Sequence, residues 1–193
     1  ARRGDWTSFQ TFYVNGNNDL DLQCDAMQAR LARSEPVKGA FASDVQALWT
    51  GERDLPDACD PVIAAARAQG ALTDAEVWAR IERSAEAGKA GAAGAAASLL
   101  AGANAADAQR IATTLRDPAT QLAQAKNWTD TPRARDAVAW GLARYARRAS
   151  AAAETLWADL QPRFRWDEAQ KNRVLHAIAL YRAALPEAVA VLG

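Results

Sequence analysis

The fold of this 193-residue chain is decided by the stretch Leu48-Trp49-Thr50-Gly51-Glu52-Arg53-Asp54-Leu55-Pro56-Asp57-Ala58-Cys59-Asp60. It follows a segment whose apolar residues recur at helical spacing, so Gly51 is expected to end that helix. Asp60 and the Pro61 that follows it are typical of an N-cap and the first position of a new helix. The stretch therefore predicts a helix, a short loop and a second helix.

Similar helix signals continue downstream. Residues 73–76 read Thr-Asp-Ala-Glu, a capping box in which each end residue can satisfy the other's backbone N–H group. Asp117-Pro118 and Thr131-Pro132 are two further starts of the cap-and-proline kind. A last long helix is expected to begin near Asp167. The segment 89–102 is almost entirely alanine and glycine, so we expect it to pack tightly between neighbouring helices.

The pattern of the whole chain indicates an all-α fold. No segment shows the alternation of apolar and polar residues that is typical of strands. The expected linkers are short, which makes successive helices antiparallel neighbours. Helix pairs recur about every 30 to 40 residues without a repeated motif. We therefore predict a right-handed α-superhelix, or solenoid, of antiparallel helix pairs formed by one segment, residues 1–193.

Charge and hydropathy exclude two classes of partner. Lys plus Arg and Asp plus Glu are both 23, so the formal net charge is zero. A nucleic-acid-binding protein normally carries a basic excess or a basic stripe, so no nucleic-acid partner is expected. No apolar run approaches the roughly 20 residues that a membrane-spanning helix needs, so no membrane span is expected.

The cysteines do not predict a metal site. Cys24 and Cys59 are the only two, and the chain has neither a CxxC motif nor clustered histidines. They either form a disulfide or remain free thiols. A disulfide would stabilise the folded chain by about 4 kcal/mol in the chain-entropy model. The glycine-rich stretch 88–94 lacks the ending of a phosphate-binding loop. No metal and no cofactor are therefore expected.

The candidate catalytic groups all have a structural explanation. His176, the single histidine, is flanked by apolar residues in the last helix, where a structural role is expected. Two carboxylates could serve glycoside hydrolysis. However, Glu82 and Glu86 share a polar helix face, and Asp57 and Asp60 stand at a helix start. We predict no catalytic residue in this chain.

The seven tryptophans are unusual in a chain with one methionine. Most of them are expected to fill gaps between the Ala-rich helices. Trp128 and Trp166 stand near segment ends, and we predict that these two contact glycan. The others are Trp6, Trp49, Trp78, Trp140 and Trp157.

The stretch 48–60 closely resembles the helical region of soluble lytic murein transglycosylases. In that family a Leu-Trp pair, a nearby glycine and then Pro-x-Ala-Cys-Asp mark a helix end, a loop and the next helix start. The resemblance continues at residues 78–81 and 87–88, and it covers roughly residues 1–100. The rest of the chain is similar mainly in its helical pattern.

This resemblance implies a periplasmic protein of bacterial cell-wall metabolism. The family breaks the β-1,4 bond between N-acetylmuramic acid and N-acetylglucosamine of peptidoglycan and leaves a 1,6-anhydro end. Its members join a long α-superhelix to a C-terminal lysozyme-like domain, whose catalytic glutamate belongs to a Glu-Ser motif. This chain contains no Glu-Ser dipeptide, so no catalytic residue can be assigned from the family. The resemblance also implies a Cys24–Cys59 bridge.

We therefore expect the non-catalytic superhelical domain of a lytic transglycosylase, inactive alone because the lysozyme-like catalytic domain is absent. Its expected partners are peptidoglycan glycan strands, bound through the parent enzyme, and that catalytic domain. The alternative is a free-standing helical-repeat scaffold for protein–protein interaction. Free thiols and an apolar groove of peptide size would favour the alternative.

Overall fold

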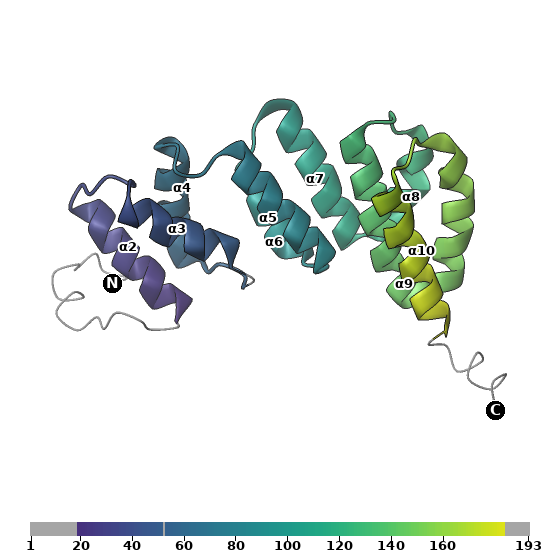
Figure 1. Ribbon diagram of the computed structural model, residues 1–193, viewed down its shortest axis with the longest axis horizontal. Coiled ribbons are helices and arrows are strands. Elements are labelled where there is room, and N and C mark those ends of the chain that lie inside the picture. The colour runs from purple at the N-terminus through teal and green to yellow at the C-terminus, as the bar shows by residue number, and fades with distance from the viewer. Residues whose placement is uncertain (1–18, 52, 184–193) are drawn as a thin grey trace. The chain divides into compact units, whose positions relative to one another are not determined.

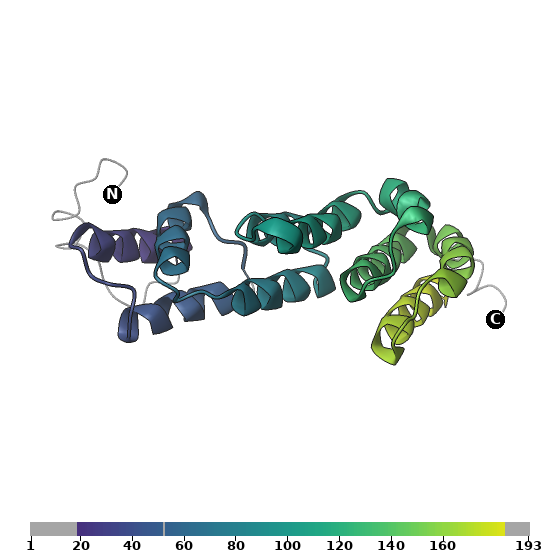
Figure 2. The ribbon, with the colours of Figure 1, turned by 90° about the horizontal axis from the view of Figure 1, so that it is seen from above.

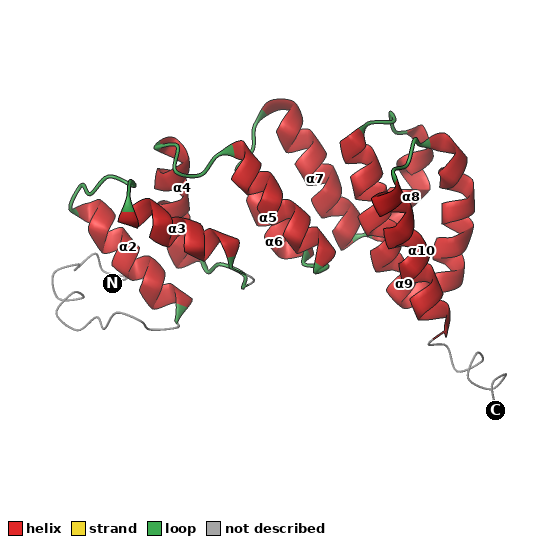
Figure 3. Cartoon of the chain, in the orientation of Figure 1, coloured by secondary structure: helices red, strands yellow, loops and turns green. Residues whose placement is uncertain are grey.

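The computed structural model describes residues 19–51 and 53–183, which form helices joined by turns (Figures 1 and 3). No strand occurs in these two ranges, which confirms the all-α fold class. The α-helices are α2 (Leu20–Ala32), α3 (Ala40–Thr50), α4 (Asp60–Ala68), α5 (Asp74–Glu86), α6 (Ala90–Ala97), α7 (Gly102–Arg116), α8 (Pro118–Gln124), α9 (Pro132–Leu160) and α10 (Glu168–Ala183). The 3₁₀ helices are η1 (Asp57–Cys59), η2 (Ala125–Asn127) and η3 (Gln161–Arg163). Within the described ranges, no helix has the length and hydropathy required to cross a bilayer.

The chain divides into two compact units, Ala1–Val77 and Trp78–Gly193, here called the first and the second unit. Each has its own buried apolar residues. In the second unit α9 and α10 pack side by side, as both ribbon views show (Figures 1 and 2).

In the first unit, α2 packs against η1 and α4. Cys24 on α2 and Cys59 on η1 form a disulfide with an S–S distance of 2.04 Å, and both residues are fully buried. Beside the disulfide, the side-chain amide of Gln28 donates a hydrogen bond to the carbonyl oxygen of Ala58 at 2.7 Å. Helix α2 is therefore joined to the 48–60 stretch by one covalent and one polar link.

An arginine at the end of α2 forms the main charged cluster of the first unit. Arg30 donates hydrogen bonds to Glu35, the shortest at 2.5 Å, and to Asp44 on α3 at 2.7 Å. Its guanidinium carbon lies 4.0 Å from the centre of the buried Phe41 ring. The hydrogen bond from Arg30 lowers the pKa of Glu35 below its ordinary value, and the same bond raises the pKa of Arg30. This cluster ties the end of α2 to the start of α3.

Three predicted helix caps are present. At α5, the Thr73 N–H group donates to Glu76 Oε2 at 2.6 Å, and the Glu76 N–H group donates to Thr73 Oγ1 at 3.4 Å. At α8 and α9, Asp117 and Thr131 each accept a hydrogen bond from the backbone N–H group three residues further on, at 3.3 and 3.1 Å. The capping box and both cap-and-proline starts are therefore confirmed.

The cap predicted at Asp60 is wrong. Asp60 is the first residue of α4 and already has helical angles, φ −54° and ψ −46°, and no side chain caps this start. The reason is the 3₁₀ turn η1, which runs directly into α4, so the backbone is helical before Asp60 is reached. The carboxylate of Asp60 remains in the first turn, where the helix dipole favours a negative charge.

Small residues allow close helix packing in the second unit. On the Ala- and Gly-rich α6, Ala93, Ala96 and Ala97 are buried, and this helix packs against α7. At Gly141 on α9, a Cβ atom would lie only 2.4 Å from Cγ2 of Thr114 on α7. Only glycine fits there without a movement of one helix against the other.

The main apolar core of the second unit is formed by α8, α9 and α10, with the short helix η2 and Phe164, which follows η3. Its buried residues are Leu122, Ala125, Ala134, Val138, Ala139, Leu142, Ala146, Ala153, Trp157, Leu160, Phe164, Val174, Ala177 and Ile178. Many of them lie on one face of α9 and one face of α10, so this core determines how those two helices lie against each other.

Candidate binding pocket

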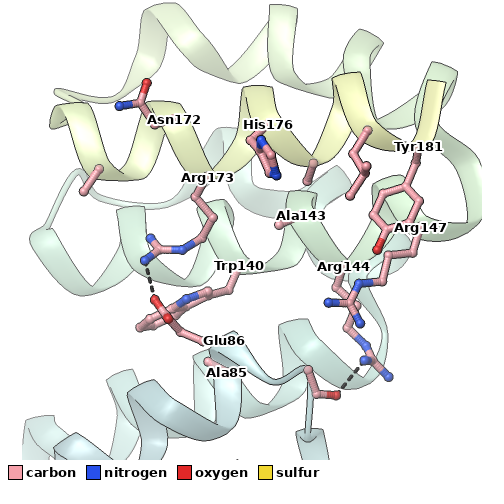
Figure 4. Close-up of a pocket in the computed structure, with 14 residues that line it drawn as sticks. Ala85, Glu86, Trp140, Ala143, Arg144, Arg147, Asn172, Arg173, His176 and Tyr181 are labelled. Carbon is pink, nitrogen blue, oxygen red and sulfur yellow. Dashed lines mark hydrogen bonds and ion pairs between the residues drawn. The ribbon is translucent and has the colours of Figure 1, made fainter. Parts of the chain in front are cut away.

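The second unit contains a pocket of about 570 Å³ between the end of α5 and the helices α9 and α10 (Figure 4). This volume is in the range of about 300–1,000 Å³ that is usual for ligand sites. The lining residues are Ala85, Glu86, Gly88, Trp140, Ala143, Arg144, Arg147, Ala169, Asn172, Arg173, His176, Ala177, Leu180 and Tyr181.

The two long helices position this lining by their periodicity. Residues spaced i, i+4 and i+7 share one helix face. Lining residues with this spacing are Trp140, Arg144 and Arg147 on α9, and Arg173, Ala177 and Leu180 on α10. Helix α9 is interrupted at Ala149, whose angles φ −150° and ψ 66° are not helical. The two α9 arginines therefore lie in the last turns of its first part, where the helix dipole favours positive charge.

Two guanidinium groups gather around Gly88 at one end of the pocket. Arg144 donates a hydrogen bond from Nη1 to the Gly88 carbonyl oxygen at 2.6 Å. A Cβ atom on Gly88 would lie 2.9 Å from Nη1 of Arg144 and 3.4 Å from Nη1 of Arg147. Gly88 also has a φ of +69°, which favours glycine. The backbone conformation therefore favours glycine after the end of α5, and the absent Cβ leaves room for the two guanidinium groups.

The opposite end of the pocket is closed by an ion pair. Arg173 Nη2 lies 2.6 Å from Glu86 Oε1, as the dashed line in Figure 4 marks. The Arg173 guanidinium carbon is also 5.2 Å from the centre of the Trp140 ring, within cation–π range. Trp140 is 5% exposed, and its indole nitrogen has no hydrogen-bond partner within residues 19–51 and 53–183. Glu86 faces three lining arginines, so the pocket carries an excess of positive charge.

The lining does not provide the paired acids of glycoside hydrolysis. Such chemistry uses two carboxylates on either side of the scissile bond, and Glu86 is the single acidic residue that lines the pocket. Glu82 is ion-paired elsewhere, with Arg133 at 2.7 Å. His176, for which the sequence predicts a structural role, is exposed and points into the pocket (Figure 4). The size of the pocket and its charged and apolar lining are suited to binding a ligand.

The tryptophans predicted to contact glycan lie outside this pocket. Trp128 is partly buried against the core, with the Arg110 guanidinium carbon 5.3 Å from its ring centre. Trp166 is also partly buried, and its ring centre is 5.0 Å from that of Trp157 and 5.3 Å from that of Phe164. Glycan contact by Trp128 and Trp166 stays a prediction.

The other described tryptophans fill the core, as predicted. Trp49, Trp78, Trp140 and Trp157 are each at most 8% exposed. Trp6 lies outside the residues that the structure describes.

Sequence reasoning misses the pocket because its walls come from distant segments. Arg144 and Gly88 are 56 positions apart, and Arg173 and Glu86 are 87 positions apart. In the sequence, the α9 arginines are fully explained by the helix dipole. The one local signal is the shared helix face of Trp140, Arg144 and Arg147, which does not reveal what lies opposite.

Comparison with known proteins relates the chain to solved structures only. No family model matches it, and no curated protein matches it. It is similar to the 70-kDa soluble lytic transglycosylase of Escherichia coli, with 21% identity and a TM-score of 0.73 over 98% of this chain and 31% of that chain. A 70-kDa soluble lytic transglycosylase in complex with bulgecin A matches with 22% identity and a TM-score of 0.70, over 98% and 31% of the two chains. An inactive mutant of the lytic transglycosylase Slt from Pseudomonas aeruginosa matches with 24% identity and a TM-score of 0.63, over 94% and 29%.

The likeness extends over nearly all of this chain, which itself spans 29–31% of the length of the matched chains. At 21–24% identity it shows the fold. The chain has the all-α superhelical fold of soluble lytic transglycosylases, which confirms at the level of fold the resemblance found in the sequence.

Proposed function

We propose that the chain is a non-catalytic superhelical domain of a soluble lytic murein transglycosylase. The observation that carries this proposal is the fold likeness over 94–98% of the chain. Because one fold can serve several functions, the motif at residues 48–60 is a necessary second support. In the structure this motif is the end of α3, a loop, η1 and the first residue of α4, with Cys59 buried against α2.

In this proposal the parent enzyme cleaves the β-1,4 bond between N-acetylmuramic acid and N-acetylglucosamine and forms 1,6-anhydro products. The segment is proposed to do no chemistry, because it lacks the Glu-Ser motif that carries the family's catalytic glutamate. Glu86, the acidic residue among the described residues that line the pocket, is paired with Arg173. A periplasmic location is consistent with the disulfide between Cys24 and Cys59, since disulfides persist in oxidising compartments. The partners are peptidoglycan strands and the catalytic domain of the parent enzyme.

The part of the segment that contacts glycan is proposed to include Trp128 and Trp166. Both residues are partly exposed and pack against the core of the second unit. The indole nitrogen of Trp166 donates to the carbonyl oxygen of Gln161 at 3.0 Å, which holds that ring in place. A ring already held by its neighbours loses little side-chain entropy when a ligand binds.

The test is co-sedimentation with insoluble peptidoglycan sacculi. The purified chain is mixed with sacculi and pelleted, and the bound fraction is compared with that of an unrelated helical protein. The double variant Trp128→Ser/Trp166→Ser is expected to lose most of the bound fraction. The matched control is Leu175→Ser, which removes a large apolar side chain that is 48% exposed.

Each outcome has a defined meaning. Saturable pelleting that depends on the two tryptophans supports direct glycan binding by the segment. Pelleting no greater than that of the unrelated protein contradicts glycan binding and leaves an architectural role. Release of soluble 1,6-anhydro fragments by the chain alone would overturn the non-catalytic assignment.

A second candidate function is a helical-repeat scaffold that binds other proteins. The observation that favours it is the pocket of about 570 Å³ in the second unit, which is in the usual volume range of ligand sites. The Cys24–Cys59 disulfide does not favour it, since free thiols are expected for such a scaffold. In the same sedimentation experiment, saturable pelleting that depends on Trp128 and Trp166 would favour the transglycosylase domain over the scaffold. Absence of pelleting would fit either a scaffold or an architectural domain.

A further inference from the structure

One end of the second unit's pocket holds two guanidinium groups that no carboxylate neutralises within the described part of the chain. Arg144 is bound there to a neutral carbonyl oxygen, that of Gly88. Arg147 is exposed and forms neither a hydrogen bond nor an ion pair with another described residue. Both Nη1 atoms lie within 3.4 Å of the point that a Gly88 Cβ would occupy. Two like charges this close repel each other, and an anion bound between them would remove that repulsion.

Glu86, the acidic side chain of the pocket, does not neutralise Arg144 and Arg147. Glu86 lies at the other end, where it is paired with Arg173 at 2.6 Å, and Figure 4 shows the two arginines of α9 grouped away from that pair. The positive excess is therefore local to Arg144 and Arg147. A carboxylate fits between them, because guanidinium groups bind carboxylates, as they bind phosphates, through two parallel hydrogen bonds.

The other lining residues indicate which groups the rest of the ligand carries. The indole N–H group of Trp140 has no partner among the described residues and can donate only to an acceptor such as a carbonyl oxygen. Because its nitrogen is buried, a ligand oxygen reaches it only when a neighbouring side chain moves. Leu180 is 51% exposed at the pocket, beside Ala143 and Ala177, and this wall favours an apolar side chain. A carboxylate, a carbonyl acceptor and an apolar side chain occur together at the C-terminal end of a peptide.

We propose that this pocket binds the C-terminal end of a short peptide, with its carboxylate between Arg144 and Arg147 and a peptide carbonyl oxygen at the Trp140 indole. The volume of about 570 Å³ suits a ligand of a few residues. A nucleic acid does not fit, because Glu86 and the apolar wall would meet its phosphates. The inference rests on contacts within the second unit and does not require the parent enzyme proposed above.

The test uses the full 193-residue chain and two synthetic probes in titration calorimetry. One probe is N-acetyl-alanyl-leucyl-alanine with a free C-terminal carboxylate, and the other is the same tripeptide with a C-terminal amide. The acid is expected to bind about tenfold or more tightly than the amide, because the neutral amide forms no ion pair with the arginines. A parallel titration with the uncharged trimer of N-acetylglucosamine tests a sugar ligand.

Two neighbouring arginines provide a matched pair of variants. Arg147→Gln is expected to weaken binding of the acid by about tenfold. Arg148→Gln removes the same charge from an exposed position outside the pocket, and less than about a twofold change is expected in salt-containing buffer. Neither guanidinium forms a hydrogen bond or an ion pair with another described residue, so both variants are expected to melt close to the temperature of the unchanged chain. In a ¹⁵N spectrum, the indole N–H resonance of Trp140 is expected to shift when the acid is added.

Several results would overturn the proposal. These are equal binding of acid and amide, an equal effect of the Arg147 and Arg148 variants, an unmoved Trp140 resonance, and no binding of the acid at about 10 mM. Binding of the sugar trimer that depends on Arg147 would also overturn it, because the ligand would then be a glycan. The sacculi experiment depends on Trp128 and Trp166 instead, so failure of one proposal is distinguishable from failure of the other.

Discussion

Replacing Gly141 with alanine tests how closely the helices of the second unit approach each other. The added Cβ would lie 2.4 Å from Cγ2 of Thr114 and 3.3 Å from Cδ2 of Leu122. Carbon atoms pack best at about 3.5–4.0 Å, so α9 must move away from α7 or the threonine must change its rotamer. Thr114 is fully buried and its hydroxyl donates to the Arg110 carbonyl oxygen at 2.7 Å, which restricts that change.

The expected magnitude follows from two opposing effects. Overpacking a buried contact costs about 1–3 kcal/mol, while alanine is favoured over glycine inside a helix by up to about 1 kcal/mol. Gly141→Ala should therefore lower the free energy of unfolding by about 1–2 kcal/mol. For a chain of this length, that corresponds to a fall in Tm of about 2–8 °C.

The assay is urea denaturation followed by far-UV circular dichroism, with two matched comparisons. Gly91→Ala on α6 makes the same change where no atom lies within 4 Å of the new Cβ, so it should raise stability by up to about 1 kcal/mol. Thr114→Ser removes the clashing methyl group and keeps the hydroxyl, so adding it to Gly141→Ala should recover part of the loss. If Gly141→Ala stabilises the chain as Gly91→Ala does, the close approach of α7 and α9 is refuted.

Three further predictions concern single side chains. Cys59→Ser should lower the free energy of unfolding by up to about 4 kcal/mol. The difference in stability from the unchanged chain should shrink when both proteins are measured in a reducing buffer. Free thiols in the unchanged chain without reductant would contradict this prediction. Because Arg30 lowers the pKa of Glu35, the stability from this pair is present above the ordinary glutamate pKa of about 4.3 and is lost as the pH falls through the lower folded-state pKa. Glu35→Gln should therefore flatten the acid side of the stability–pH curve, and an unchanged curve would exclude the pair as its cause. Asp117→Ala removes a cap hydrogen bond and should lower the free energy of unfolding by about 1 kcal/mol. Asp60→Ala removes no cap hydrogen bond and should lower it clearly less in the same urea titration. Equal losses of stability would contradict the cap assignments.

Helix boundaries are the part of the fold that local sequence predicts well. The caps of Thr73, Asp117 and Thr131 form because each one joins a side chain to a backbone N–H group within three residues. The cap predicted at Asp60 is wrong because the 3₁₀ turn η1 runs directly into α4. The residues around Asp60 carry no local signal for that turn. A second capping pair is present at the start of α10, where the carboxylate of Asp167 accepts a hydrogen bond from the Gln170 N–H group at 2.7 Å. The sequence predicts the start of this helix near Asp167 but not this pair.

The candidate site depends on contacts that local sequence does not contain. The resemblance at residues 48–60 and the spacing of apolar residues were sufficient to predict helices, because these signals are repeated within a few residues. Which helix faces meet is decided by packing between segments, and at Gly141 that packing depends on a single missing methyl group.

The amino-acid sequence alone therefore determines the all-α class and most helix starts, since capping and helical periodicity are short-range interactions. The tertiary structure alone brings Gly88 to Arg144 across 56 positions and Glu86 to Arg173 across 87 positions. These contacts arise from burial of the apolar faces of α9 and α10, a force that is non-directional and does not specify in advance which polar groups it brings together. The pocket and the grouping of Arg144 and Arg147 in it are consequences of that packing.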